Sequence, residues 1–222
     1  LAYTMIGSGV SMGIHESQSR FFENIIGRSE AFISLIFPKI KELFPEQFEN
    51  VTAHDFYLAV NKAEPSLIRT EADELTYSMH IMVRYEIEKR LMDGSLSTKD
   101  LPNEWNRLYK EYLGIDVPCD SMGCLQDSHW SGGALGYFPS YSLGSAYGAQ
   151  FLHKMKQDID IDKLVSENRI DEVTAWLTEK IHKYGMLLTP AQLIENACGE
   201  EFNADYYIEY LTEKYNKIYE LK

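Results

Sequence analysis

The apolar residues of this chain recur at helical spacing along most of its length, and this periodicity restricts the possible folds more than any other feature. The longest such pattern runs from Ser66 to about Met92, and its apolar positions are Leu75, Met79, Met82, Val83 and Ile87. Most of these positions lie three or four residues from another, which is helical spacing. Alternation with a period of two, which would indicate strands, is absent except for a possible short β ribbon near 115–125. We therefore expect an all-α protein.

Residues that begin and end helices divide the chain into segments of ordinary helix length. Ser29 and Thr52 are suitable N-caps, Thr189-Pro190 is an N-cap followed by proline in the first turn, and Gly94 and Gly114 are suitable stops. Pro38 predicts a kink or a break. We expect one helical unit, with helices near 10–27, 29–44, 53–62, 66–92, 97–113, 140–157, 160–168, 170–184, 189–198 and 203–220.

Composition excludes some classes of function. The 222 residues carry 21 basic and 34 acidic side chains, a formal charge of −13, which argues against nucleic acid as a partner because phosphate binding needs a basic surface. No apolar run approaches the length of a membrane-spanning helix, and no secretory signal is visible. Three cysteines, an odd number, suggest a reducing compartment. We expect a cytoplasmic protein with no membrane partner.

The first segment with candidate functional residues is Gly13-Ile-His-Glu-Ser-Gln-Ser-Arg20. On a helix, Glu16 and Arg20 lie one turn apart on the same face. The pair is either a structural ion pair or a metal ligand supported by its neighbours, which include His15 and Gln18. Taken alone, the segment favours the ion pair.

A second segment, Ile68-Arg-Thr-Glu-Ala-Asp73, places Arg69 and Asp73 four residues apart. If this stretch is helical, the spacing by itself favours an ion pair on the helix surface. Farther along the same predicted helix, His80 and Arg84 share a face. The sequence alone gives weak evidence that these residues line a cleft together.

The third segment, Gly123-Cys-Leu-Gln-Asp-Ser-His-Trp130, holds four side chains with candidate chemistry within five residues, namely Gln126, Asp127, His129 and Trp130. The simplest interpretation is structural, with a buried hydrogen-bonded histidine, a loop-capping aspartate and a core tryptophan. Tyr137 and Tyr141 follow at the start of a predicted helix. A buried tyrosine can serve packing alone once its hydroxyl is satisfied.

Together these segments resemble the carboxypeptidase Taq family of thermostable zinc metallocarboxypeptidases. Gly9 to Asn24 resembles the segment that supplies the glutamate zinc ligand, and the other two segments match further motifs of the family in the same order. The resemblance covers essentially all of residues 1–222. It implies a multi-helix domain that lines one side of a peptidase cleft and forms the C-terminal part of a single catalytic domain.

The resemblance also implies roles for individual residues. Glu16 corresponds to the glutamate ligand of zinc, with His15, Gln18 and Arg20 as its neighbours. Arg69 is the first candidate to bind the free carboxylate of a substrate, because arginine binds carboxylates in a bidentate manner, and Arg84 is the second. The other residues implied to lie at the substrate site are Asp73, Gln126, Asp127 and Trp130.

Two kinds of side chain are implied to act on the tetrahedral intermediate. His129 would donate to its oxyanion or to the peptide, where a preorganised donor stabilises the transition state. By a broader similarity to peptidases with an HExxH motif, a tyrosine hydroxyl would assist. Tyr137 is the better candidate and Tyr141 the alternative.

The HExxH motif, from which this family takes two zinc ligands and the general base, does not occur in the 222 residues. His15-Glu16 is followed by Ser-Gln-Ser, and no two histidines are four residues apart. We therefore expect a C-terminal fragment that lacks an N-terminal half, binds no zinc stably and is inactive alone. The complete enzyme is expected to be a zinc-dependent homodimer that removes single amino acids from peptide C-termini. The alternative is a non-catalytic helical module that binds peptides or mediates assembly.

Overall fold

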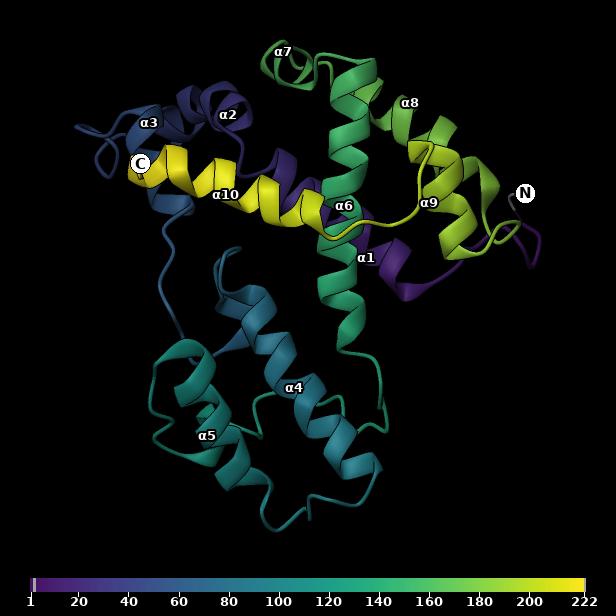
Figure 1. Cartoon of the computed structure of the whole chain (residues 1–222). Coiled ribbons are helices and arrows are strands. Elements are labelled where there is room, and N and C mark those ends of the chain that lie inside the picture. Colours follow the sequence, from purple (N-terminus) through teal and green to yellow (C-terminus); the bar gives the residue numbers. More distant parts are fainter. Residues whose placement is uncertain (2, 222) are drawn as a thin grey trace. The chain divides into compact units, whose positions relative to one another are not determined.

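A computed structural model describes residue 1 and residues 3–221, and in this part of the chain all regular structure is helical (Figure 1). There are ten α-helices, one π-helical turn and three short 3-10 turns, and no strand among these residues. The all-α prediction is confirmed. The β ribbon considered near 115–125 does not form, because this stretch contains the 3-10 turn η3 (Asp120–Met122).

The chain folds into two compact units. Unit 1 consists of residues 1–61 and 143–222, and unit 2 of residues 62–142. The boundary falls within the first turns of α6 (Pro139–Asp158), which begins in unit 2 and continues in unit 1.

Unit 1 holds most of the helices. Besides the larger part of α6 they are α1 (Met12–Arg20), the π-helical turn η1 (Phe21–Ile26), α2 (Glu30–Leu43), α3 (Ala53–Val60), α7 (Ile161–Ser166), α8 (Ile170–Lys180), η4 (His182–Tyr184), α9 (Pro190–Cys198) and α10 (Asp205–Tyr219).

Three predicted helix starts in unit 1 are confirmed by their hydrogen bonds. The hydroxyl of Ser29 accepts from the backbone N–H of Phe32, and Thr52 and Thr189 each form a reciprocal capping box with the residue three positions later. Pro38 lies inside α2 without ending it. The apolar faces of α1, α6, α8 and α9 meet in one core, whose fully buried members include Phe21, Phe151, Val173 and Leu177.

Two helices of unit 1 approach each other unusually closely. A Cβ atom built on Gly144 of α6 would lie 2.6 Å from Cβ of Glu16 in α1 and 2.8 Å from its carbonyl carbon, so only glycine fits there. Gly148, one turn later, has more room, with the Ser17 carbonyl oxygen 3.4 Å from its built Cβ. The small residues of α6 thus bring it close to the segment that carries Glu16.

Unit 2 contains η2 (Arg69–Glu71), α4 (Tyr77–Met92), α5 (Leu101–Leu113), η3 and the start of α6. α4 and α5 lie side by side (Figure 1) and enclose a core that includes Val83, Ile87, Trp105 and Tyr109. Gly114 ends α5 with a φ of 73°, in the left-handed region that favours glycine.

The prediction of a continuous helix from Ser66 to Met92 is wrong in its first part. Ala72 has extended dihedral angles, and α4 begins only at Tyr77. The Asp73 carboxylate accepts hydrogen bonds from the backbone N–H of Thr76 at 2.9 Å and of Glu64 at 3.0 Å. Aspartate side chains compete in this way with helical hydrogen bonds, so the residue fixes a turn.

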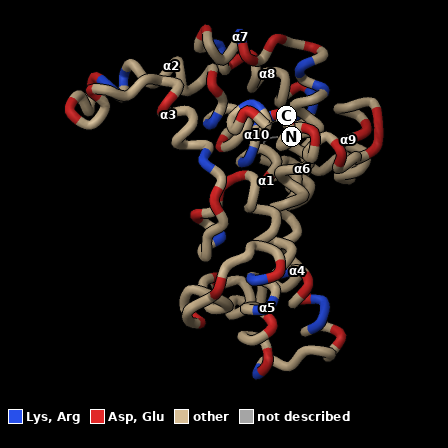
Figure 2. Tube along the Cα trace, turned by 60° about the vertical axis from the view of Figure 1, so that its left-hand side comes forward, with Lys and Arg blue, Asp and Glu red and all other residues tan. Residues whose placement is uncertain are grey.

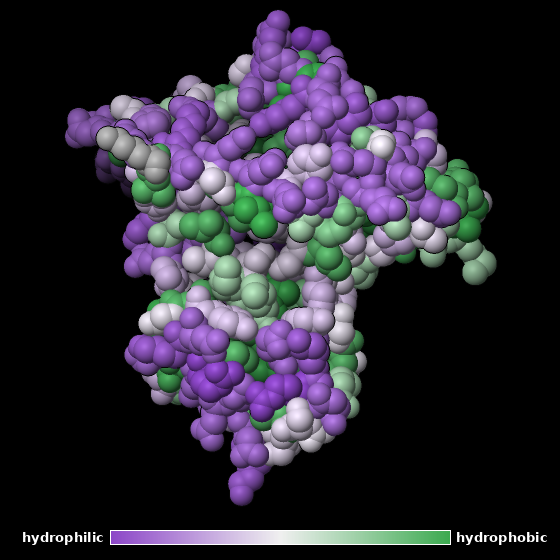
Figure 3. Space-filling view, viewed as in Figure 1, coloured by the Kyte–Doolittle hydropathy of each residue, from purple (hydrophilic) through white to green (hydrophobic). Residues whose placement is uncertain are grey.

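The surface is charged and mixed in character. Acidic and basic residues are both scattered along the chain (Figure 2), and hydrophilic side chains surround smaller apolar areas (Figure 3). Among the residues that the structure describes, no helix combines the length and the apolar character that a bilayer crossing requires.

Candidate functional site

A buried charge network in unit 2 joins two of the segments singled out in the sequence. Nε and Nη2 of Arg69 donate to Oδ1 of Asp127 at 3.1 and 2.7 Å, and Nε of Arg84 donates to Oδ2 at 2.6 Å. Arg84 is fully buried, Arg69 is 6% exposed, and the Asp127 side chain is 10% exposed. One carboxylate therefore binds two guanidinium groups in a largely dry environment.

The network keeps Asp127 ionised. Burial by itself would raise the pKa of this carboxyl, but the hydrogen bond from Arg69 and the charge of Arg84 outweigh burial and lower it. Each guanidinium also faces aromatic rings. Arg84 lies 4.6 Å from the ring centroid of Trp105, and Arg69 lies 4.8 Å from that of Tyr141.

Gln126 ties this network to the 3-10 turn that carries Arg69. Its side-chain oxygen accepts from the backbone N–H of Arg69 at 2.8 Å, and its nitrogen donates to the carbonyl of Leu67 at 2.9 Å. The motif around Gln126 and the motif around Arg69 therefore form one structure, although 57 positions separate them.

One expectation for this region is wrong. Arg69 does not pair with Asp73, because its partner is Asp127 and Asp73 accepts from local backbone N–H groups. His80 and Arg84, which share a face of α4 as expected, are both 0% exposed and lie in the interior of unit 2.

His80 and Arg84 are held by hydrogen bonds within this interior. Nδ1 of His80 lies 3.1 Å from the hydroxyl of Tyr109, and Nη1 of Arg84 donates to the His80 carbonyl at 2.7 Å. Burial, reinforced by the charge of Arg84, lowers the pKa of His80 to about 3. His80 is consequently neutral at pH 7.

His129 lies at the edge of the network, beside two tyrosines. Its Nε2 is 2.9 Å from the hydroxyl of Tyr141, and its Nδ1 is buried without a hydrogen-bond partner in the described part of the chain. Asp127 Oδ1 is 3.9 Å from Nδ1, too far for a hydrogen bond. Burial lowers the pKa of His129, so a neutral imidazole faces Tyr141.

The two tyrosines differ in what their hydroxyl groups do. Tyr141 shares its hydroxyl with His129. The ring of Tyr137 lies 5.6 Å from that of His129, and its hydroxyl makes no hydrogen bond with the residues that the structure describes. Tyr137 therefore has a hydroxyl available to a bound molecule, which is the property that the sequence could not assign.

Trp130 is half-buried and is held by a residue that the sequence analysis missed. Its indole Nε1 donates to Oε1 of Glu88 at 2.8 Å, and the same oxygen accepts from the backbone N–H of Gly136 at 3.0 Å. Glu88 is 5% exposed. It follows His80 and Arg84 at intervals of four, so three polar residues on one helical face gave a signal that α4 buries polar groups.

In unit 1, Glu16 forms the predicted ion pair with Arg20. Nε of Arg20 donates to Oε1 of Glu16 at 2.9 Å, and the hydroxyl of Ser19 donates to Oε2 at 2.8 Å. The Glu16 side chain retains 21% exposure. Its carboxylate is thus oriented by two donors but remains accessible.

His15 and Gln18 flank Glu16 and border a cavity of about 280 Å³ in unit 1. A Cβ on Gly9 would lie 2.4 Å from Nε2 of His15, so glycine lets the incoming chain pass over that ring. The Gln18 side-chain oxygen lies 2.8 Å from Nε2 of His182.

The described part of the chain shows no cluster of side chains that would complete a metal site. Within residue 1 and residues 3–221, no three His, Cys, Asp or Glu side chains converge as a metal would require. Catalytic zinc uses three protein ligands. Glu16 has the chemistry of one such ligand, and the residues present do not supply the remainder.

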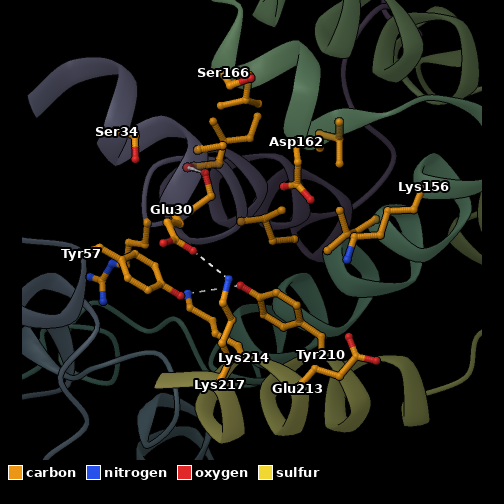
Figure 4. Close-up of a pocket in the computed structure, with 18 residues that line it drawn as sticks. Glu30, Ser34, Tyr57, Lys156, Asp162, Ser166, Tyr210, Glu213, Lys214 and Lys217 are labelled. Atoms are coloured by element: carbon orange, nitrogen blue, oxygen red, sulfur yellow. Dashed lines mark hydrogen bonds and ion pairs between the residues drawn. The ribbon is translucent and has the colours of Figure 1, made fainter. Parts of the chain in front are cut away.

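A larger cavity of about 620 Å³ lies elsewhere in unit 1 (Figure 4). Glu30 and Lys217 point toward each other across it, with 2.7 Å between Oε2 and Nζ, and Lys214 lies near Tyr210. None of the residues predicted to form the site lines this cavity.

Comparisons with known proteins identify the family of this chain. The family model described as carboxypeptidase Taq (M32) metallopeptidase matches residues 1–215. Carboxypeptidase 1 of Bacillus subtilis is 48% identical over 99% of this chain and 44% of its own length. Thermostable carboxypeptidase 1 of Pyrococcus furiosus is 45% identical over 96% of this chain and 43% of its own length. The chain thus spans less than half the length of these relatives.

Solved structures give the same result for the fold. The M32 carboxypeptidase from Deinococcus radiodurans has a TM-score of 0.93 at 39% identity, covering 97% of this chain and 44% of that one. Metallocarboxypeptidase 1 of Trypanosoma cruzi has a TM-score of 0.90 at 39% identity, covering 94% and 44%. From its motifs, its helical fold and these similarities, the chain belongs to the carboxypeptidase Taq (M32) metallopeptidase family.

Proposed function

We propose that residues 1–222 form the C-terminal part of a zinc metallocarboxypeptidase catalytic domain that removes single amino acids from peptide C-termini. One observation carries this proposal. Unit 2 brings His129, Tyr137 and Tyr141 together beside the Arg69–Asp127–Arg84 network, so hydrogen-bond donors for a developing oxyanion and guanidinium groups occupy one region. Family membership supports the same activity.

Tyr137 and His129 are the proposed donors to the oxyanion of the tetrahedral intermediate. The hydroxyl of Tyr137 lies beside the His129 ring and makes no hydrogen bond with described residues. Tyr141, through its 2.9 Å contact, fixes the orientation of the imidazole. Donors that are oriented before reaction stabilise the transition state without reorganising.

Arg69 is the better candidate of the two arginines to bind the substrate carboxylate. It retains 6% exposure, whereas Arg84 is fully enclosed and serves to hold Asp127. Three of the five guanidinium N–H groups of Arg69 donate to Asp127 and Tyr77. The remaining N–H groups give it limited capacity for a substrate. Asp73, Gln126, Asp127 and Trp130 support this region through hydrogen bonds.

Glu16 is the proposed zinc ligand of this chain, and the other ligands are proposed to lie outside the 222 residues. An ionised carboxylate accepts about four hydrogen bonds or metal contacts, so the donors Arg20 and Ser19 orient it without saturating it. Zinc would polarise the attacking water and the scissile carbonyl. On this proposal the isolated chain is inactive.

Two further proposals rest on the resemblance and on composition. A homodimer is proposed because the family resemblance implies it. A cytoplasmic location is proposed because the three cysteines remain free thiols.

Zinc content and peptide binding together test the function. Elemental mass spectrometry of the purified, untagged chain should find less than about a tenth of an equivalent of zinc, since one carboxylate is too few ligands. A full equivalent that disappears in Glu16→Ala would show a complete site and contradict the proposal of an inactive fragment.

A second experiment measures binding of two labelled peptides by fluorescence anisotropy. One peptide has a free C-terminal carboxylate, and the other is the same peptide with a C-terminal amide. We expect about tenfold tighter binding of the free acid, because a guanidinium–carboxylate contact is charge-assisted. Arg69→Gln should remove the preference, while the exposed Arg107→Gln serves as the control. Equal binding of both peptides would contradict a carboxylate-binding role.

The alternative function is a non-catalytic helical module for peptide binding or assembly. The observation that favours it is that the residues described by the structure do not converge in a metal-binding cluster. Peptide binding that ignores the C-terminal carboxylate would support this alternative.

A further inference from the structure

Glu88 is a buried carboxylate to which neither the resemblance nor the proposed mechanism gives a role. It lies on the inner side of α4 and is 5% exposed. Arg84, one turn earlier, pairs with Asp127, and among the described residues Glu88 has no ion-pair partner. Burying a carboxylate is costly unless hydrogen bonds replace its water. Its environment should therefore show what it is for.

The donors to Glu88 come from the two ends of one loop. Its Oε1 accepts from the indole N–H of Trp130 at 2.8 Å and from the backbone N–H of Gly136 at 3.0 Å. Gly136 has a φ of 75°, a backbone conformation that favours glycine. A single oxygen on a rigid helix thus joins the beginning and the end of residues 130–136.

Between these two points the loop is closed by its own hydrogen bonds. The backbone N–H groups of Gly132, Gly133 and Ala134 donate to Ser128, Trp130 and His129 at 2.8–3.0 Å. These bonds make the loop a compact turn. They act only among residues 128–134, however, whereas the bonds to Glu88 attach the loop to α4.

The residues next to the two attachment points are the ones proposed to contact the tetrahedral intermediate. His129 immediately precedes Trp130, and Tyr137 immediately follows Gly136. Their ring centroids are 5.6 Å apart. Any change in the separation of the loop ends would therefore move these two side chains relative to each other.

We propose that Glu88 is a positioning residue that fixes His129 and Tyr137 relative to each other by holding both ends of residues 130–136 on α4. Its importance for catalysis rests on the function proposed above. The attachment of both loop ends to Glu88 can be tested in this chain without any activity. The essential property is an acceptor oxygen at this point, which a glutamine also provides.

The test uses four variants. Glu88→Gln keeps an acceptor oxygen and removes the charge, and Glu88→Ala removes both. Trp130→Phe deletes one donor and leaves the Gly136 bond. Glu86→Ala, on the same helix, is the matched control, because Glu86 is more exposed and pairs with Lys89. The measurements are the indole N–H signal of Trp130, the exchange rate of the Gly136 amide and the pKa of His129, all by NMR.

The amide of Gly136 should exchange about tenfold faster or more in Glu88→Ala, since a hydrogen bond to a charged acceptor is lost. Glu88→Gln and Glu86→Ala should retain most of its protection. Trp130→Phe should give an intermediate effect. The indole N–H signal of Trp130 should move in Glu88→Ala and stay near its original position in Glu86→Ala.

The pKa of His129 separates positioning from simple loss of charge. The Glu88 charge contributes to raising this pKa, so both Glu88 variants should lower it equally through charge. Loosening of the loop would admit water to the ring and reduce the desolvation that depresses the pKa. We therefore expect a higher His129 pKa in Glu88→Ala than in Glu88→Gln.

Equal Gly136 exchange rates and equal His129 pKa values in the two Glu88 variants would overturn the proposal. If Glu88→Ala does not fold, Glu88→Gln and Trp130→Phe still decide it, because unchanged Gly136 exchange in Trp130→Phe would show that the two bonds do not act together. These readouts need no substrate. Failure of the carboxypeptidase proposal would instead appear in the peptide-binding experiment.

Discussion

Asp127 determines whether the interior of unit 2 can tolerate two arginines. Arg84 is completely buried and Arg69 nearly so, and the carboxylate of Asp127 hydrogen bonds to both. Removing one partner of a buried pair costs more than the pair contributes, because the remaining charge stays uncompensated. Without the Asp127 carboxylate, the charges of both Arg69 and Arg84 would remain uncompensated.

Asp127→Asn should destabilise unit 2 by about 3–5 kcal/mol. The measurement is urea unfolding followed by the fluorescence of Trp105 and Trp130. Asp116→Asn is the control, because that side chain is 86% exposed and its pair with Lys110 contributes at most about 1 kcal/mol. Equal effects of the two substitutions would contradict the buried network.

The pH dependence of Asp127 follows from its lowered pKa. A carboxyl with a folded-state pKa below its unfolded value contributes stability above the unfolded value, near 4, and loses it as the pH falls through the folded value. Wild-type protein should therefore show acid destabilisation in that range which Asp127→Asn lacks. Parallel acid-unfolding curves for the two proteins would contradict this assignment.

His80 should act in a higher pH range. Its pKa of about 3 lies below the unfolded value near 6.5, so the unfolded chain binds more protons between these limits and stability falls as the pH falls. Unfolding in urea should show a loss of about 2 kcal/mol between pH 7 and pH 5. His80→Gln should reduce that loss, and the exposed His153→Gln should not.

At the scale of secondary-structure elements, the contact between α1 and α6 places Glu16. The two helices approach closely because Gly144 has no side chain, and the atoms that a Cβ would meet are the backbone and Cβ of Glu16. Neither can move aside as the end of a flexible side chain could. The position of the proposed zinc ligand therefore depends on a glycine in another helix.

Gly144→Ala should destabilise unit 1 by about 1–3 kcal/mol through overpacking. Gly148→Ala in the same helix is the matched control, since its nearest contact would be an ordinary 3.4 Å and alanine favours helix by up to about 1 kcal/mol. Thermal unfolding followed through Trp176 of unit 1 measures both. If Gly144→Ala left the stability of unit 1 unchanged, the two helices would have to lie farther apart than the structure shows.

At the scale of the whole molecule, each unit has its own apolar core. The core of unit 1 includes Phe151 and Leu177, and that of unit 2 includes Ile87 and Trp105. Separate cores permit separate local unfolding, which hydrogen exchange detects.

Hydrogen exchange in Asp127→Asn tests this independence. Amides of α4 and α5 should lose protection by about a hundredfold or more, as expected for a loss of about 3 kcal/mol, and amides of α8 and α9 should change far less. Mass spectrometry of peptide fragments measures both sets in one sample. An equal loss of protection in both units would show that the chain unfolds as a single cooperative body.

Features that depend on residues close together in the chain could be predicted from the sequence. Helical periodicity predicted the all-α fold, and the caps at Ser29, Thr52 and Thr189 predicted helix starts, because each depends on contacts within a few positions. The three motifs also sufficed for the family, since they occur in a fixed order in the chain. The ion pair of Glu16 with Arg20 followed from helical spacing alone.

Which side chains meet across long stretches of chain depends on how distant segments pack, and this could not be read from local spacing. Local spacing paired Arg69 with Asp73, but Asp73 competed successfully for nearby backbone N–H groups and the fold supplied Asp127 instead. The role of Glu88 as the acceptor for both ends of one loop was equally invisible, because its donors lie 42 and 48 positions away. Helical periodicity reports which face is buried, whereas the identity of a buried polar partner depends on how distant segments pack.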